Sequence, residues 1–241
     1  MVANRVPLAL LPGTLCDAQL FAPQVAALAD VAAPQVVDMT QSATLAGAAA
    51  DVLVAMPERF ALAGLSYGGI VAFEVWRQAP ARVLGMALLN ATHLPPSPQT
   101  KEAQQRFVGM AVTGEFREIT TDYLKDRMLH PAHQLDMHMR ETVLAMAQSV
   151  GKAGFINQVK AQLARPDSTP TLPTITCPAL VLTGREDQVC TVQIHEQMAA
   201  AIPNATLKII EECGHLSTLE QPEAVNDAMR MWLQQIGEQT W

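Results

Sequence analysis

The chain has 241 residues, of which 49% are hydrophobic and 16% are charged. This balance is typical of a globular protein and excludes a disordered chain, and the length suffices for one α/β domain with a modest insertion. The formal net charge is −7, and no run of Lys and Arg stands out. We therefore expect no nucleic-acid partner.

Four cysteines, Cys16, Cys177, Cys190 and Cys213, have spacings that fit neither a zinc site nor a disulfide framework, so free thiols in a reducing compartment are expected. The N-terminal residues carry no signal-peptide pattern, and no apolar run reaches membrane-spanning length. We therefore expect a soluble, cytoplasmic protein with no membrane partner. The sequence carries no pattern that sets an oligomeric state.

Apolar runs and helical spacings alternate along the first part of the chain. They predict strands at 6–11, 34–39, 60–63 and 83–89, and helices at 20–29, 44–56 and 70–76. The alternation returns near the C-terminus, with strands at 179–183 and 205–211 and helices at 191–202 and 219–236. Repeated strand–helix units predict an α/β fold with a mostly parallel, doubly wound sheet.

The middle of the chain breaks this alternation. After the rigid stretch 95–98, helical patterns cover 101–112, 116–129, 135–150 and 152–163, and no strand is evident. We interpret residues 94–176 as a helical cap inserted into a core formed by residues 1–93 and 177–241. Five methionines of the cap are expected to pack, or to form a pliable apolar wall for a substrate: Met110, Met128, Met137, Met139 and Met146.

Residues 64–69, with the sequence Gly-Leu-Ser-Tyr-Gly-Gly, lie between a predicted strand and a predicted helix. Gly-x-Ser-x-Gly in that setting is the pattern of a nucleophile elbow, a sharp turn that exposes Ser66. The glycines are needed because the tight turn brings neighbouring backbone against their positions. The alternative is a glycine-rich turn that only joins the strand to the helix.

Four polar segments follow predicted strands: residues 12–14, Ser66, residues 184–187 and residues 213–215. In an open parallel sheet, binding sites form outside the carboxyl ends of the strands. We therefore expect these segments to meet at one edge of the molecule, although they are spread over most of the chain.

A serine hydroxyl needs a base to act as a nucleophile, and the base needs a carboxylate that orients it. We expect His215 to be the base and Asp187 the carboxylate, because Ser, Asp and His occur in the order typical of this elbow. Glu186 and Asp167 are alternative carboxylates. The backbone N–H groups of Thr14 and Tyr67 are expected to form the oxyanion hole.

Taken together, the motifs at 10–14, 64–69, 182–187 and 213–215 resemble those of the α/β-hydrolase superfamily, in its serine-hydrolase branch with a helical cap. The resemblance covers essentially the whole chain and implies no cofactor and no metal. Many relatives carry His-Gly where this chain has Pro12-Gly13. Some relatives place the acid after the strand that here ends at residue 89. Asn90 in that position cannot carry a negative charge, which favours Asp187.

Other histidines are weaker candidates. His130, His133 and His138 lie close together but lack convincing carboxylate or cysteine companions, so a metal site is not expected. His93 is interpreted as a surface or packing residue.

The expected function is hydrolysis of small, largely apolar carboxylic esters through an acyl-enzyme on Ser66. Three other reactions could use the same residues: hydrolysis of a lactone or enol lactone, hydrolysis of a carbon–carbon bond, and transfer of the acyl group to an acceptor other than water. A non-catalytic protein that binds a small molecule is an alternative of another class. No cluster of positive charge in the cap demands an anionic substrate, although five cationic residues are available: Arg106, Arg117, Lys125, Arg127 and Arg140.

Overall fold

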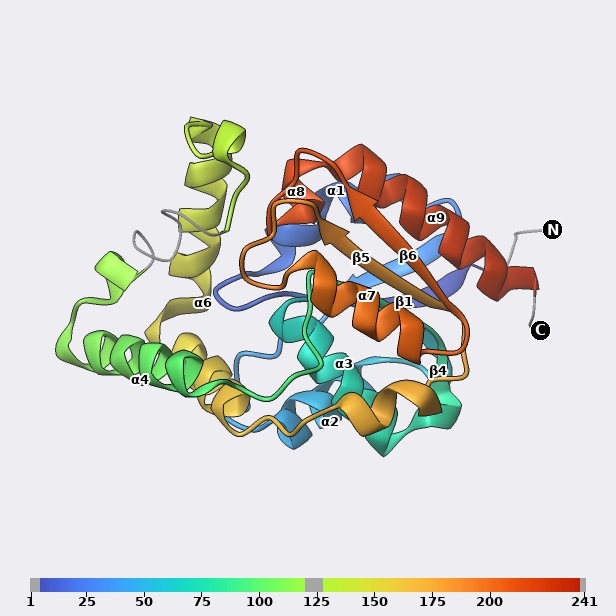
Figure 1. Cartoon of the computed structure of the whole chain (residues 1–241), viewed down its shortest axis with the longest axis horizontal. Coiled ribbons are helices and arrows are strands. Elements are labelled where there is room, and N and C mark those ends of the chain that lie inside the picture. Colours follow the sequence, from blue (N-terminus) through green and yellow to red (C-terminus); the bar gives the residue numbers. More distant parts are fainter. Residues whose placement is uncertain (1–4, 120–127, 239–241) are drawn as a thin grey trace.

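The computed structural model describes residues 5–119 and 128–238. Its centre is a six-stranded parallel sheet with the strand order β2-β1-β3-β4-β5-β6 (Figure 1). The strands are β1 (Val6–Leu11), β2 (Ala32–Val36), β3 (Phe60–Leu65), β4 (Val83–Leu89), β5 (Ala179–Gly184) and β6 (Ala205–Ile210). The predicted parallel α/β fold is confirmed.

Helices cover both faces of the sheet, as expected for a doubly wound fold. Leu8 and Leu10 of β1 pack toward α1 (Ala22–Ala27) and α9 (Pro222–Glu238). Ala9 and Leu11 point to the opposite face, in one apolar cluster with residues of α2 (Leu45–Ala55), α3 (Tyr67–Gln78) and α7 (Val192–Ala201). This alternation follows from the two-residue period of a strand and explains why the central strands read as continuous apolar runs.

The strand register brings the carboxyl ends of the strands together. Leu11 at the end of β1 pairs with Gly64, Leu65 at the end of β3 pairs with Leu89, and Leu89 pairs with Leu182. The segments that follow β1, β3, β4 and β5 therefore begin at the same edge of the sheet, which is where the sequence predicted the polar segments to meet.

Proline explains two differences from the predicted helices. The helix expected at 20–29 is a 3₁₀ turn, η1 (Ala18–Phe21), followed by the short helix α1, which has a proline in its first turn. The helix expected at 219–236 is divided into α8 (Ser217–Glu220) and α9, which begins at Pro222. Proline lacks a backbone N–H and suits the first turn of a helix, so each helix restarts there.

The second strand also differs from its prediction. It spans Ala32–Val36 instead of 34–39 and includes Pro34, although proline cannot donate a hydrogen bond to a neighbouring strand. The position is tolerated because β2 is the edge strand of the sheet and pairs with β1 alone.

Between β4 and β5 lie α4 (Pro98–Thr113), η3 (Pro131–His133), α6 (Met137–Leu163) and η4 (Thr169–Thr174), with no strand among the described residues of the segment. Figure 1 shows α4 and α6 beyond the carboxyl ends of the strands. A non-helical residue, Gly151 with φ 66°, interrupts α6 between the two helices predicted at 135–150 and 152–163. The helix predicted at 116–129 falls mostly on residues 120–127, outside the described part.

Candidate active site

Ser66 lies in a sharp turn between β3 and α3, with φ 55° and ψ −112°. A non-glycine residue rarely adopts this backbone conformation, and such residues cluster at functional sites where the surrounding structure holds them. The N–H of Ser66 donates to the carbonyl of Leu89 at 3.0 Å, which ties the turn to the end of β4. The side chain lines a cavity at the edge of the sheet.

The glycines around Ser66 are explained by space. A Cβ atom on Gly64 would overlap the backbone of Gly68, and one on Gly68 would overlap the carbonyl of Leu11. A Cβ atom on Gly69 would overlap the side chain of Ala91. The predicted reason for the Gly-x-Ser-x-Gly pattern, close approach of the neighbouring backbone, agrees with these contacts.

Asp187 and His215 are brought together from the ends of β5 and β6. Oδ2 of Asp187 lies 2.8 Å from Nδ1 of His215, and both side chains are buried. The other oxygen, Oδ1, accepts hydrogen bonds from the N–H groups of Val189 at 2.8 Å and Cys190 at 2.9 Å. Burial opposes the charge of Asp187, but the neighbouring His215 and the hydrogen bonds outweigh it and lower the pKa of this carboxyl.

Asn90 has a role that the sequence did not reveal. Its Nδ2 donates to Oδ2 of Asp187 at 2.9 Å and to the carbonyl of Gly214 at 3.1 Å, while its Oδ1 accepts from the hydroxyl of Ser217. Asn90 is fully buried and has φ 46°. Asn90 therefore links the side chain of Asp187 to the loop that carries His215. From the sequence we inferred only that Asn90 cannot replace Asp187 as the acid.

The two alternative carboxylates, Glu186 and Asp167, make hydrogen bonds with groups other than His215. Glu186 accepts a hydrogen bond from the N–H of Cys213 at 3.0 Å, and Asp167 accepts from the hydroxyl of Thr169 at 2.6 Å. Of the three candidates, Asp187 is therefore the carboxylate that contacts the ring of His215.

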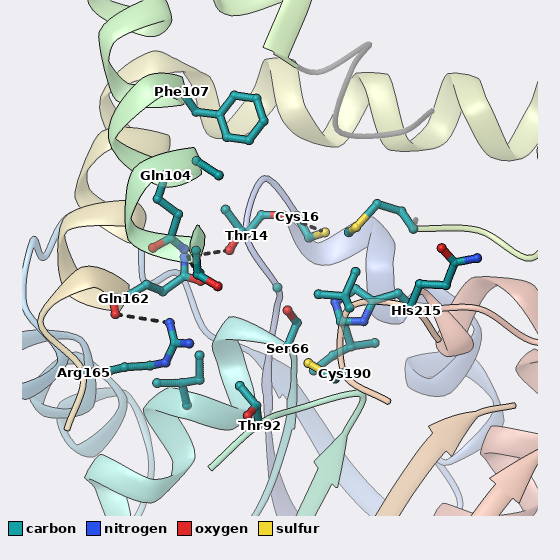
Figure 2. Close-up of a pocket in the computed structure, with 18 of the residues that line it drawn as sticks. Thr14, Cys16, Ser66, Thr92, Gln104, Phe107, Gln162, Arg165, Cys190 and His215 are labelled. Carbon is teal, nitrogen blue, oxygen red and sulfur yellow. Dashed lines mark hydrogen bonds between the residues drawn. The ribbon is translucent and has the colours of Figure 1, made fainter. Parts of the chain in front are cut away.

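Ser66 and His215 line the same cavity (Figure 2). Because Nδ1 of His215 faces Asp187, Nε2 is the ring atom left for the serine. Among the described hydrogen bonds none joins Oγ of Ser66 to this ring. Such bonds are often long before substrate binds, and rotation about one side-chain bond reorients the hydroxyl. The transfer of a proton from Ser66 to His215 stays a prediction.

The two backbone groups predicted to hold the oxyanion make no other hydrogen bond within the described structure. The N–H of Thr14 lies in the loop after β1, and Thr14 lines the cavity. The N–H of Tyr67 is at the first position of α3, where a helix has no internal partner for it and its dipole favours negative charge. The arrangement suits an oxyanion hole.

Two buried glutamines of α6 attach the cap to this loop. Oε1 of Gln158 accepts from the N–H of Leu15 at 3.0 Å, and Nε2 of Gln162 donates to Oγ1 of Thr14 at 2.9 Å (Figure 2). Gln104 of α4 in turn donates to Gln162 at 3.4 Å. Helix α6 therefore contacts the segment that carries one of the predicted oxyanion donors, and α4 contacts α6, a link that no sequence motif indicated.

The cavity has a volume of about 560 Å³ and lies between the core and the cap. Its polar and charged lining includes Thr14, Ser66, Thr92, Gln99, Thr100, Gln104, Arg106, Gln162, Arg165, Gln188 and His215. Of the five methionines expected to pack or to form an apolar wall, only Met128 lines the cavity, and Met146 is fully buried in the core.

The chemistry of the site favours an acid–base pair over a metal centre. Ligand atoms of Asp187, Cys190 and His215 lie within 4.8 Å of one another. However, burial raises the pKa of the Cys190 thiol well above its ordinary value, and metals bind the thiolate. Asp187 and His215 are already hydrogen-bonded to each other through Oδ2 and Nδ1. Outside this group, His133 contacts the buried Glu220, with Nδ1 3.1 Å from Oε2.

A family model described as "Alpha/beta hydrolase family" matches residues 10–228 of the chain. The chain belongs to the alpha/beta hydrolase family. The matched region contains the end of β1, strands β2 to β6 and the cap, and it includes Ser66, Asp187 and His215.

Individual members of the family resemble the chain to different extents. A thermophilic esterase from Thermogutta terrifontis, solved with malate bound, is 28% identical with a TM-score of 0.89, over 98% of this chain and 92% of that one. The (E)-2-((N-methylformamido)methylene)succinate hydrolase of Acinetobacter baylyi is 27% identical over 70% of this chain and 63% of its own length. The 3-oxoadipate enol-lactonase 2 of the same organism is 39% identical over 28% of this chain and 25% of its own length. The chain thus spans less than two thirds of either curated relative.

Proposed function

We propose that this alpha/beta hydrolase is a serine hydrolase that cleaves small carboxylic esters through an acyl-enzyme on Ser66. The observation that carries the proposal is the buried Asp187–His215 pair, of which His215 lines the same cavity as a serine in a strained turn. A positioned base and an oriented carboxylate are what a serine hydroxyl needs to become a nucleophile.

In the proposed reaction, Oγ of Ser66 attacks the ester carbonyl and Nε2 of His215 takes its proton. The charge of Asp187 stabilises the imidazolium through the bond to Nδ1. The N–H groups of Thr14 and Tyr67 stabilise the oxyanion. His215 then returns the proton to the leaving alcohol, and water activated by the same ring releases the acid from Ser66.

Lactone hydrolysis is the second candidate, and two relatives favour it. The 3-oxoadipate enol-lactonase 2 shares 39% identity with this chain over 67 residues, and an enol-lactonase from Burkholderia xenovorans has the same fold with a TM-score of 0.85. Opening a lactone and cleaving an ester have the same acylation and deacylation steps. The carbon–carbon bond hydrolases among the relatives provide a third candidate of the same mechanism.

The polar lining of the cavity also changes the expected substrate. Four glutamine and two arginine side chains line it, together with the threonines at positions 14, 92 and 100. Ligand sites match the polarity of what they bind, because a buried polar group without a partner costs free energy. Apolar side chains, among them Leu65, Ile70 and Phe107, line the cavity as well. We therefore favour a small ester that carries a polar group beside an apolar part, in place of the largely apolar ester that the sequence suggested.

A fluorophosphonate probe tests the nucleophile. It reacts covalently with activated serines, so the wild-type protein should be labelled and Ser66→Ala should not. Labelling that survives the Ser66→Ala substitution would mean that Ser66 is not the nucleophile.

A substrate panel then separates the remaining functions. Short esters, lactones and dienoic diketones distinguish the three bond types, and added alcohols reveal acyl transfer. Tight binding of these compounds without turnover by the wild-type protein would favour a non-catalytic binding protein over an enzyme.

A further inference from the structure

We propose that the substrate carries a free carboxylate and that the guanidinium of Arg165 binds it while the scissile carbonyl lies at Ser66. The inference rests on the proposed function only for the position of the scissile bond. The carboxylate site itself follows from the charge, placement and partners of the residues that line the cavity.

The charge of the cavity is the first observation. Arg106 and Arg165 line it, and within the described part of the chain none of its lining residues is an aspartate or a glutamate. The protein as a whole is acidic, with a net charge of −7. A cavity that collects positive side chains in a negatively charged protein attracts anionic ligands and repels cationic ones.

The placement of Arg165 is the second observation. Arg165 follows α6 and is partly buried, and its guanidinium is held from two sides. Nε donates to the carbonyl of Leu94 at 2.9 Å, and Nη1 donates to the carbonyl of Gln162 at 3.3 Å. Figure 2 shows this guanidinium directed into the cavity that contains Ser66. Both acceptors are main-chain carbonyls, so they orient the guanidinium within the cavity lining.

An anchored guanidinium suits a carboxylate in particular. The two parallel N–H groups of arginine match the two oxygens of a planar carboxylate, and such charge-assisted pairs are about twice as strong as neutral hydrogen bonds. Because main-chain carbonyls already fix the side chain, little rotamer freedom is lost when the anion binds. The volume of about 560 Å³ fits a substrate with one acid group at one end and the ester at the other.

A buried amide oxygen adds to the polar character of the cavity. Oε1 of Gln104 is buried without a hydrogen-bond partner, although Gln104 lines the cavity. A buried acceptor that lacks a donor costs free energy in the empty protein, and a ligand with a hydroxyl or amide group offsets that cost. The lining thus offers polar partners to an anion, next to apolar side chains such as Phe107 and Leu216 that suit the rest of a substrate.

Matched pairs of substrates test the proposal by turnover. Monomethyl succinate, glutarate and adipate are compared with methyl 4-methylpentanoate, 5-methylhexanoate and 6-methylheptanoate, in which an isopropyl group replaces the carboxylate. The wild-type enzyme should prefer the acid member of at least one pair. Arg165→Met should lower kcat/KM for that acid by roughly 10- to 100-fold, mainly through KM, and should change the neutral ester less than threefold. Arg165→Lys should recover part of the loss.

Arg140 supplies the matched control. It also lies on α6 and donates to a main-chain carbonyl, that of Gln134 at 3.0 Å, but it does not line the cavity. Arg140→Met changes the net charge by the same amount and should leave the preference for the acid unchanged. Equal losses on acid and neutral esters in Arg165→Met, or equal effects of the two arginine substitutions on the acid, would overturn the carboxylate site.

A binding measurement keeps this test separate from the proposed function. Calorimetry with free succinate, glutarate and adipate on Ser66→Ala protein needs no turnover. We expect at least one of them to bind and its Kd to rise roughly 10-fold or more in Ser66→Ala with Arg165→Met, but not with Arg140→Met. Loss of all ester hydrolysis with this binding pattern intact would contradict the proposed function alone. Absence of binding, or binding that Arg165→Met does not weaken, would contradict the carboxylate site alone.

Discussion

Asp187 is buried with its charge because hydrogen bonds converge on both of its oxygens. Asn90 and His215 donate to Oδ2, and the N–H groups of Val189 and Cys190 donate to Oδ1. The side chain is fixed before substrate arrives, so His215 is held in the tautomer that presents Nε2 to the cavity. In the proposed mechanism Asp187 therefore contributes orientation as well as charge.

Replacing this acid with its amide tests that role. Asp187→Asn should lower kcat by about 10,000-fold, because the amide loses the charge and stabilises the wrong tautomer of His215. Glu186→Gln is the control. Glu186 accepts a hydrogen bond from the N–H of Cys213, and its replacement by the amide should change kcat little. The assignment fails if kcat, measured on the best ester, falls more in Glu186→Gln than in Asp187→Asn.

His195 is a buried histidine outside the proposed relay, and its partners define a neutral ring. Nε2 accepts from the N–H of Ala91 at 3.0 Å, so Nδ1 is the atom that donates to the carbonyl of Thr191 at 3.0 Å. Burial lowers the pKa of His195 from 6.5 to about 4. Ala91 lies against Gly69 of the elbow, so the hydrogen bond from Ala91 to His195 helps to hold the backbone next to Ser66.

The lowered pKa of His195 predicts a pH dependence of stability. Between pH 6.5 and about 4 the unfolded chain binds a proton that the folded chain does not. The free energy of unfolding should therefore fall as the pH decreases through this window, by on the order of 3 kcal/mol in total. His195→Gln can keep both hydrogen bonds without the titration. Urea unfolding from pH 7.5 to 4.5 should show a smaller loss in His195→Gln, and parallel curves for the two proteins would contradict the prediction.

At the scale of elements, the cap is attached to two of the loops that carry the predicted chemistry, the one after β1 and the one that contains His215. Gln158 and Gln162 hold the loop after β1, through Leu15 and Thr14. The carbonyl of Met128 accepts from the N–H of His215 at 3.0 Å. The cap thus has two functions in this account, which are to close the cavity and to position groups that belong to the core.

Loss of the glutamine contacts should slow the reaction without abolishing it. Gln158→Leu leaves the N–H of Leu15 without its acceptor, so the neighbouring oxyanion donor of Thr14 is less well placed. We expect kcat to fall roughly 10-fold with little change in KM, and fluorophosphonate labelling to slow in proportion. Asn157→Ala is the matched control, because its side chain joins the same helix to the carbonyls of Thr40 and Gln41, away from the site. Equal effects of the two substitutions would indicate a purely structural role for Gln158.

At the scale of the whole molecule, the sequence predicted the fold and the convergence of the site for one physical reason. In a parallel sheet every strand ends at the same edge, so motifs that follow strands must meet however far apart they lie in the chain. Ser66, Asp187 and His215 each follow a strand, and the structure brings all three to that edge.

The contacts of the cap could not be predicted in the same way. Which side chains of α6 face the loop after β1 depends on the rotation of the helix after its interruption at Gly151, and no motif encodes that angle. The placement of Arg165 could not be predicted either, because its anchors on Leu94 and Gln162 come from segments that meet only in the folded chain. The anionic preference proposed for the cavity therefore required the structure.

An acyl-enzyme is the central intermediate of this account, and mass spectrometry can detect it directly. The protein is mixed with an excess of the best ester, quenched in acid within milliseconds and digested. We expect the acyl mass on the peptide that contains Ser66 in the wild-type protein, and neither the adduct nor turnover in Ser66→Ala. Turnover that persists in Ser66→Ala, or an acyl group found on another residue, would contradict the account.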